Sequence, residues 1–372
     1  MGRQLRATAS VGEGAPGQPG HDTMASVTVE RSARPGRRAV RIALEAFTVA
    51  LGIHLLLPRV AGFEEVGRAI ARGSWVSIVA LVVFEAASLL AYGELVHVVL
   101  RSMGEQASRT LIQRTTLVGT SLGRTLPGGT TTALAVVVNA LRRAGLNGVR
   151  STTALATSGL LSSFVLAVLL VPAVILAMAG GQDGGIALGA GVAALAIIGF
   201  VGIVVPAARR PQAVGAFVER WLRRVVPRPL YHHIDPVVAA RAAEEAVRGV
   251  RRLLRDPGAL GRGLLCAAAN WLFDVAALTA VAVTVGRGTP LSGILLAYIV
   301  GQLAAAVPLT PGGVGIVETA MIGSLVAAGA PVAAATATVL GWRLFSYWLP
   351  ILAGLGLLPT LPRRPRFRTA GA

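Results

Sequence analysis

The chain contains no lysine, so all 35 of its basic residues are arginine. Its single cysteine, Cys266, excludes a disulfide within the chain and a cysteine-built zinc site. Charged residues make up 14% of the sequence, well below the roughly 25% usual in soluble domains. Histidine, cysteine and carboxylate residues do not gather at ligand spacing, and neither a Ser-His-Asp arrangement nor a nucleotide-binding loop stands out. We therefore expect no metal, no cofactor and no enzymatic activity.

Apolar residues dominate what remains, at 54% of the chain and a mean hydropathy of +0.67. Several apolar runs reach the roughly 20 residues that a membrane-crossing helix needs. This pattern predicts an all-α polytopic membrane protein. The net charge of +18 does not indicate a nucleic-acid partner, because the arginines flank apolar segments, where the positive-inside rule accounts for them.

Eight apolar segments are expected within a single transmembrane domain over residues 39–358. Six of them are unbroken, and two are interrupted near the middle. Residues 1–38, rich in arginine, glycine and proline, are expected to form a disordered cytoplasmic tail, and residues 359–372 a basic cytoplasmic tail. The segments cover residues 40–58, 75–100, 111–141, 152–178, 185–206, 262–286, 291–328 and 331–358.

The one long loop, residues 207–261, contains a predicted amphipathic helix over residues 236–255. A proline follows Asp235 at its start, and an Asp-Pro-Gly sequence ends it. Its polar side carries Glu244 and Arg248, which are spaced for an ion pair. We expect this helix to lie at the membrane interface. Its apolar face carries Val247, Val250 and Leu254.

Both interrupted segments carry the same tripeptide, Pro-Gly-Gly, at residues 127–129 and 311–313. Proline removes a backbone donor and glycine adds backbone freedom, so neither segment continues as one helix. Non-helical backbone at membrane depth is tolerated only where protein or a water-filled cavity satisfies its polar groups. The two breaks therefore indicate a polar site inside the bilayer. The alternative is that they only form two tight turns.

The arginine clusters decide the expected topology, because cytoplasmic loops are rich in arginine. Clusters lie in the N-terminal tail, in the 207–261 loop and after residue 362. All of them, with Arg142 and Arg143, fall on the cytoplasmic side only if each broken segment enters and leaves on the same side. Residues 111–141 as one helix would be about 46 Å long, too long for a core of about 30 Å. We therefore expect two re-entrant helical hairpins of opposite orientation in an inverted repeat, with both termini cytoplasmic.

Around the two breaks the sequence resembles a known family. Residues 307–318, Val-Pro-Leu-Thr-Pro-Gly-Gly-Val-Gly-Ile-Val-Glu, and residues 123–129, Gly-Arg-Thr-Leu-Pro-Gly-Gly, resemble the flippase-like membrane proteins. That family is similar to the transmembrane flippase region of lysylphosphatidylglycerol synthase. The resemblance covers residues 40–358 and implies movement of a lipid across the bacterial inner membrane. It does not imply lipid lysylation, because the residues after Pro359 do not supply an aminoacyl-transferase domain.

Charged side chains at membrane depth cost about 2.5–3.5 kcal/mol each on insertion scales, and they usually pair or line a pathway. Arg124 precedes the first break, and the helix N-terminus after that break is suited to a phosphate. Glu318 follows the second break and is suited to a cationic group or a proton. The alternative is structural pairing, as Glu318 with Arg343 or Asp274 with Arg124.

Polar residues also share helix faces in the expected segments, with Glu85, Ser88 and Tyr92 on one face of residues 75–100. The candidate headgroup-binding residues are Arg124, Gly128, Gly129, Thr130, Thr131, Asn270, Asp274, Pro311, Gly312, Gly313, Glu318, Arg343 and Tyr347.

These features together predict a flippase-like protein that holds an anionic or zwitterionic phospholipid, or a polyprenyl-linked lipid, between two hairpins. Two alternatives stay open. A membrane enzyme acting on lipid-linked intermediates would use Asp274 and Glu318 as acid and base, and would form product in detergent. A regulatory or assembly subunit would use the arginine-rich loop to hold anionic lipid or a partner enzyme, and would co-purify with that partner.

Overall fold

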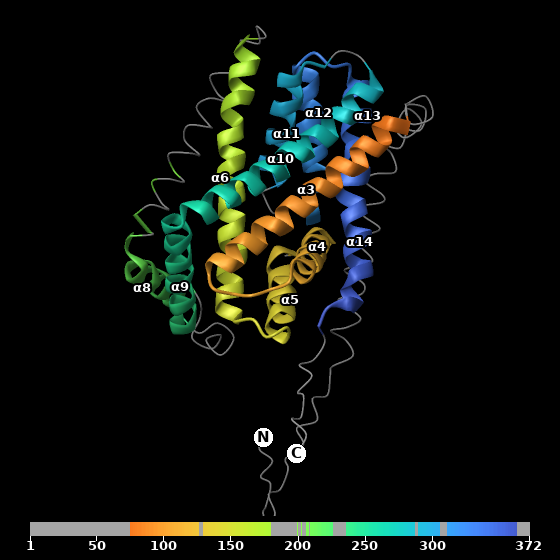
Figure 1. The fold of residues 1–372 in the computed structure, drawn as a ribbon. Helices are drawn as coiled ribbons and strands as arrows, with labels where there is room; N and C mark the ends of the chain where they lie inside the picture. Colours follow the sequence, from red (N-terminus) through yellow and green to blue (C-terminus); the bar gives the residue numbers. More distant parts are fainter. Residues whose placement is uncertain are drawn as a thin grey trace, which may run out of the picture. The chain divides into compact units, whose positions relative to one another are not determined.

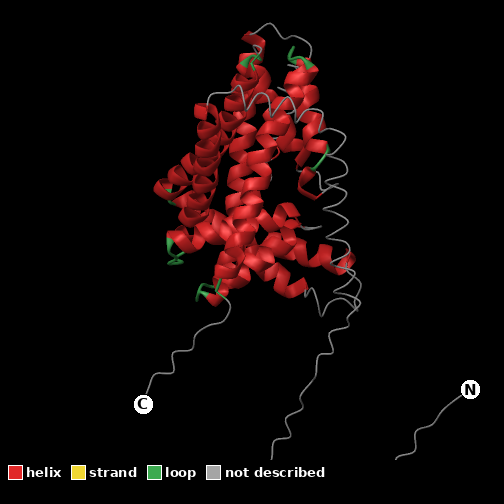
Figure 2. Cartoon of the chain, turned by 90° about the vertical axis from the view of Figure 1, so that its right-hand side faces the viewer, coloured by secondary structure: helices red, strands yellow, loops and turns green. Residues whose placement is uncertain are grey.

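The structure is a computed structural model that describes residues 75–125, 129–179, 209–225, 236–286, 289–305 and 311–362, and the single positions 199, 202, 206 and 207. The described residues form helices and their connections, with no strand among them (Figure 2). This confirms the all-α class for that part of the chain. Apart from those single positions, the expected segments 40–58 and 185–206 lie outside the described residues, as do residues 1–38 and 363–372.

Three helices contain apolar stretches long enough to cross a membrane: α3 (Trp75–Ser102), α6 (Gly148–Ala179) and α10 (Pro257–Val285). They coincide with three of the unbroken segments expected from the sequence. The start of α10 is set by local chemistry, because the Asp256 side chain accepts a hydrogen bond from the Ala259 backbone nitrogen at 2.9 Å. These helices make the chain a membrane-embedded protein.

Helices α3 and α10 pack along each other in opposite directions (Figure 1). Phe84 stacks on Phe273 with ring centroids 6.3 Å apart, and Ser88 accepts a hydrogen bond from the Asn270 amide at 2.8 Å. Contacts therefore move forward along α3 as they move backward along α10. Gly263 continues this series, because a Cβ there would lie 3.7 Å from the Leu95 side chain.

The first broken segment forms a helical hairpin of α4 (Arg109–Thr125) and α5 (Gly129–Arg143), which pack on each other. Gly119 lies opposite Val137 and Gly123 opposite Ala133, so the two helices are antiparallel. Glycines at this seam let the two backbones approach closely. At 17 and 15 residues, each helix is about 25 Å long or less, which is too short to cross a core of about 30 Å alone.

The second broken segment forms a hairpin of the same kind, with α11 (Leu291–Ala305) packed against α12 (Ile316–Ala327). Gly301 lies opposite Met321 along the seam. The turn contains the short 3-10 helix η3 (Pro311–Gly313). Backbone φ is 61° at Gly312, 68° at Gly313 and 87° at Gly315, values that only glycine adopts without strain.

The expected helix over residues 331–358 is interrupted by a π-helical turn, a feature that often marks a functional site. Before the turn the chain packs against α10 and α12, and after it against α4. Gly354 permits the second contact, because a Cβ there would lie 2.6 Å from the Leu117 carbonyl oxygen. The elements are α13 (Val332–Arg343), the π turn η4 (Leu344–Trp348), α14 (Leu349–Leu357) and the 3-10 turn η5 (Leu358–Thr360).

The long loop holds two helices, α8 (Pro211–Val225) and α9 (Pro236–Arg255). Helix α9 has the bounds expected for the amphipathic helix, and its Arg248 pairs with Glu244 at 2.8 Å. Helix α8 was not expected. Instead of facing only a membrane surface, α9 packs against α6 and α8, and a Cβ at Gly249 would lie 2.5 Å from the Thr153 side chain.

The described elements repeat one order, a long helix followed by a hairpin and a further helix. The first set is α3, α4–α5 and α6, and the second is α10, α11–α12 and α13–α14. Together with the antiparallel pair of α3 and α10, this order is what an inverted repeat requires. The side of the membrane from which each hairpin enters stays a prediction.

Adding one methyl group at the contact of α14 with α4 should destabilise the fold. Gly354→Ala places a Cβ against Leu117 backbone atoms, and overpacking of this kind costs about 1–3 kcal/mol. Gly356→Ala is the matched control on the same helix, since nothing lies within 4 Å of its Cβ position. Thermal unfolding in detergent should show a lower midpoint for Gly354→Ala alone. Equal midpoints for the two variants would contradict this close contact.

Candidate functional site

A cavity of about 560 Å³ lies between the two hairpins and the helices around them. Both sets of elements line it, from α3, α4, α5 and α6 on one side and from α10, α11, η3, α12, α13 and η4 on the other. Its charged lining residues are Arg124, Asp274 and Arg343. Its uncharged polar lining includes Tyr92, Thr116, Thr120, Gln302 and Ser346.

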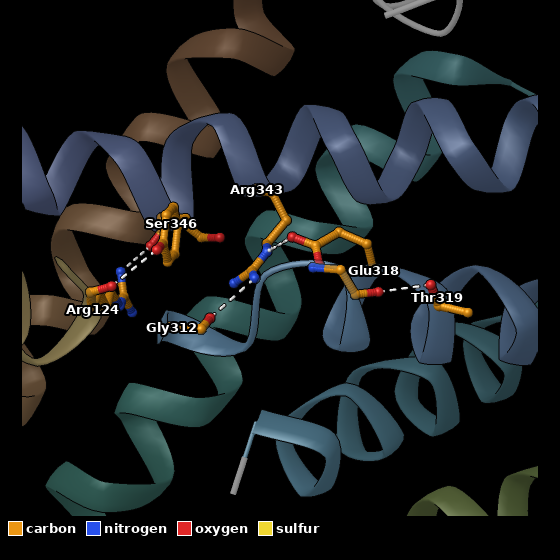
Figure 3. Close-up of polar contacts among 8 residues, drawn as sticks. Arg124, Gly312, Glu318, Thr319, Arg343 and Ser346 are labelled. Carbon is orange, nitrogen blue, oxygen red and sulfur yellow. Dashed lines mark hydrogen bonds and ion pairs between the residues drawn. The ribbon is translucent and has the colours of Figure 1, made fainter. Parts of the chain in front are cut away.

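Arg124 lies in the last turn of α4 and reaches toward the π turn (Figure 3). Its Nη1 donates a hydrogen bond to the Ser346 carbonyl oxygen. Across the described part of the chain, no carboxylate lies within ion-pair distance of this guanidinium. A guanidinium has five N–H donors, so Arg124 keeps donors for a further partner in the cavity.

Tyr347 joins the two breaks. Its hydroxyl donates to the Arg124 carbonyl oxygen at 3.0 Å. Gly312 lies against the same two groups, because a Cβ there would be 2.5 Å from the Tyr347 hydroxyl oxygen and 2.9 Å from the Arg124 carbonyl oxygen. The second Pro-Gly-Gly turn therefore contacts the end of α4, directly before the first Pro-Gly-Gly sequence. The π turn places Tyr347 where it makes this contact.

Glu318 and Arg343 form a buried ion pair that closes the second turn (Figure 3). Arg343 Nε donates to Glu318 Oε1 at 2.7 Å, and Arg343 Nη2 donates to the Gly312 carbonyl oxygen at 3.2 Å. Glu318 Oε2 accepts from the Gly315 backbone nitrogen at 2.6 Å, as a capping residue does. The Arg343 guanidinium also lies over the Tyr347 ring, 4.6 Å from its centroid. Glu318, a candidate acceptor for a cationic headgroup, thus has both oxygens bonded within the protein.

Asp274 does not pair with Arg124, the partner considered for it from the sequence. Its carboxylate accepts from the Tyr298 hydroxyl at 2.7 Å and from the Trp342 indole nitrogen at 3.1 Å. The Glu85 carboxyl group lies close enough to interact with it electrostatically. Glu85 is 2% exposed, and its Oε2 is buried with no partner in the described structure.

Asn270 serves a different purpose from the other candidates. Its amide nitrogen donates to the Ser88 hydroxyl at 2.8 Å and to the Ser88 carbonyl oxygen at 3.1 Å, and Ser88 donates back to the Asn270 carbonyl oxygen at 2.9 Å. These bonds hold α3 to α10. Asn270 does not line the described cavity.

The structure thus divides the predicted site residues into three groups. Four line the cavity: Arg124, Asp274, Gly312 and Arg343. Four do not line it: Gly313, Glu318 and Tyr347 contact its lining residues, and Asn270 joins α3 to α10. The others lie outside what is described in side-chain detail: Gly128, Gly129, Thr130, Thr131 and Pro311.

Several residues of the site were not expected from the sequence. Tyr298 and Trp342 hold Asp274 by their polar tips, and Ser346 binds Arg124 through its backbone. Gln302 lines the cavity from the apolar helix α11, where a lone amide is the signal that would have identified it. The backbone role of Ser346 leaves no such signal.

An apolar groove of about 420 Å³ adjoins the cavity. It runs between α3, α4 and α14, and its lining includes Leu89, Leu117 and Leu349. Tyr92, Thr116 and Thr120 line both the groove and the cavity. A cavity with charged and polar groups on its wall therefore borders a more apolar groove, a combination that matches a ligand with a charged head and a hydrocarbon tail.

The comparison with known families matches residues 43–354 to the lysylphosphatidylglycerol synthase TM region. The chain belongs to this family. It is a membrane protein of the flippase-like type, as the residues around the two breaks predicted.

A curated relative is the protein named Glycosyltransferase AglD from Haloferax volcanii, which is 34% identical over 153 residues. The match covers 40% of this chain and 23% of AglD, so the chain spans less than a quarter of that relative's length.

Breaking the ion pair between Glu318 and Arg343 should destabilise the protein strongly. Removing one partner leaves a buried charge, at a cost of about 3–5 kcal/mol, whereas removing both leaves none. Arg343→Gln and Glu318→Gln should each lower the thermal unfolding midpoint in detergent, and the double variant should lose less than the sum.

Arg248→Gln provides the control for that pair, because its partners Glu244 and Glu245 lie nearer the surface and exposed pairs contribute about 0–1 kcal/mol. Additive effects of Glu318→Gln and Arg343→Gln would show that the two side chains act independently.

Proposed function

We propose that this protein binds the phosphate-bearing headgroup of a membrane lipid in the cavity between its two hairpins and moves that lipid across the bilayer. The observation that carries this proposal is Arg124, a cation on the cavity wall with donors to spare and no carboxylate at ion-pair distance among the described residues. Guanidinium matches the geometry of phosphate oxygens and binds them through charge-assisted hydrogen bonds.

The state of Arg343, the second cation of the cavity, supports the assignment of phosphate binding to Arg124. Arg343 is held by Glu318, by the Gly312 carbonyl oxygen and by the Tyr347 ring. Its charge is balanced and its orientation is fixed, so it shapes the cavity wall. Arg124 therefore carries the charge that an anionic ligand would meet.

The apolar groove supports a lipid over a soluble anion. With its headgroup in the cavity, a lipid would have its hydrocarbon chains at Tyr92, Thr116 and Thr120, where the groove begins. Burial of apolar area contributes about 25 cal/mol per Å², which a soluble phosphate could not gain. A phospholipid and a polyprenyl-linked lipid share this chemistry.

Alternating access is the mechanism that we propose for the movement. The two hairpins meet at Gly312 and the end of α4, and glycines with positive φ form the second turn. A shift of one hairpin against the other would open the cavity to one leaflet and close it to the other. In this proposal the protein is a transporter of the bacterial inner membrane with both termini in the cytoplasm, and it is not an enzyme.

An enzyme acting on lipid-linked intermediates is the second candidate. The name of the relative AglD, a glycosyltransferase, favours an enzymatic activity over transport. Asp274 is the carboxyl group on the cavity wall that would serve this chemistry. Incubation of the purified chain with a polyprenyl phosphate sugar in detergent tests this candidate, because an enzyme would convert it without a second compartment.

Loss of the Arg124 charge should reduce lipid movement. Proteoliposomes of phosphatidylethanolamine and phosphatidylglycerol with fluorescent phosphatidylglycerol report movement as the fraction that dithionite quenches over time. A charge-assisted hydrogen bond contributes about 1.5–3 kcal/mol, so Arg124→Gln should slow movement by roughly 10- to 100-fold.

Arg101→Gln is the matched control, because Arg101 is exposed in the last turn of α3, away from the cavity. An unchanged rate in Arg124→Gln would overturn the role of this arginine. Equal quenching in protein-free liposomes would overturn the transport function itself.

A further inference from the structure

Two carboxyl groups lie near each other at the cavity, Asp274 on its wall and Glu85 behind it. Glu85 on α3 and Asp274 on α10 follow Phe84 and Phe273, whose rings stack where the two long helices pack antiparallel, next to the bonded pair Ser88 and Asn270. An ionised carboxylate only accepts hydrogen bonds, so two neighbouring carboxylates repel each other unless one of them carries a proton. Two carboxyl groups this close do not both ionise in a buried site.

The surrounding charges agree with one bound proton. Three carboxyl groups and two guanidinium groups meet around the cavity: Glu85, Asp274, Glu318, Arg124 and Arg343. Glu318 and Arg343 neutralise each other, which leaves Arg124 as the cation for two carboxyl groups. With one proton on the pair the cluster is neutral, whereas without it one negative charge is in excess.

The helices packed around Glu85 and Asp274 bring the following charged and hydrogen-bonding groups near them. Tyr298 of α11 donates to Asp274, Trp342 of α13 does the same, and Arg124 of α4 attracts both carboxyl groups at longer range. From η4 comes Tyr347, which is bonded to the Arg124 carbonyl oxygen. Helix α6 has one ionisable residue in its described length, Arg150 in its first turn, and that residue pairs with Glu105.

The positions of the two carboxyl groups differ in a way that suits proton exchange. Asp274 lines the cavity, which is the side from which a proton would reach the pair. Glu85 lies behind it, with Oε2 buried and without a partner. Packing of α3 on α10 does not need this pair, because Ser88 and Asn270 already join the helices with uncharged groups.

We propose that Glu85 and Asp274 form a proton-binding site whose occupancy controls the binding of an anionic lipid headgroup at Arg124. This rests on the proposed function. When the pair holds its proton, it carries a single negative charge, and Arg124 is free to bind phosphate. When the proton leaves, the second negative charge attracts Arg124 and repels the phosphate. Anionic headgroup and proton therefore bind together, and headgroup affinity falls as pH rises.

Calorimetric titration of the full chain in detergent with short-chain phosphatidylglycerol tests this. Titrations in two buffers of different ionisation enthalpy give the number of protons taken up on binding. We expect uptake of up to one proton per lipid bound. At pH values where Glu85 and Asp274 have lost their shared proton, the Kd for the lipid should rise by up to about tenfold per pH unit.

Glu85→Gln should abolish proton uptake by the pair without abolishing lipid binding at Arg124. The amide introduced there donates to Asp274 as the shared proton does, so the pair is fixed in its singly charged form. Binding should then persist without proton uptake, and the Kd at alkaline pH should equal that of the natural protein at acidic pH. Glu94→Gln on the same helix is the control, since Glu94 pairs with Arg109 near the surface and should leave uptake unchanged.

Each outcome of these titrations decides a separate point. If the natural protein bound the lipid without proton uptake and without pH dependence, the proton link would be overturned and the proposed function would stand. This outcome is measured on the natural protein alone. Uptake that persists in Glu85→Gln would overturn the assignment to this pair. No binding of the anionic lipid at any pH would overturn the proposed function instead.

Discussion

A broken helix inside an apolar protein frees backbone groups that water cannot reach, and the second hairpin bonds these groups with one ion pair. The Gly312 carbonyl oxygen accepts from Arg343, the Gly315 nitrogen donates to Glu318, and the two side chains bond to each other. Unsatisfied backbone groups cost several kcal/mol each in such surroundings. This closed set of bonds holds the turn against α4, and the cavity between the hairpins depends on it.

The same ion pair determines the electrostatics of the cavity. Because Arg343 is matched by Glu318, its charge is unavailable to a ligand. Arg124, Asp274 and Glu85 then form a separate set in which one cation faces two acids. In the proposed function, a phosphate and a carboxylate would compete for that cation, so a proton and a lipid headgroup would be linked through an arginine that bonds to neither acid directly.

The sequence predicted the features that depend on local chemistry. Pro-Gly-Gly predicts a turn wherever it occurs, so both hairpins were expected, and the pairing of Glu318 with Arg343 was one of two alternatives considered. The other, Asp274 with Arg124, does not form, and Asp274 bonds instead to Tyr298 and Trp342. That choice depends on which faces of α11 and α13 turn inward, and the hydropathy of those helices is too uniform to show it. The π turn and α8 were missed for a similar reason, since neither interrupts the apolar or basic pattern around it.

The π turn at Leu344–Trp348 divides the C-terminal helix into two parts that pack against different sets of helices. Before it, α13 packs against α10 and α12 of the second half, and after it α14 packs against α4 of the first hairpin. One residue changes the direction of a helix face by about 100°. Shortening this turn by one residue would therefore rotate Gly354 away from Leu117 while α13 kept its place. Besides their direct contact at Gly312 and the end of α4, the two hairpins are thus connected through the five residues of this turn.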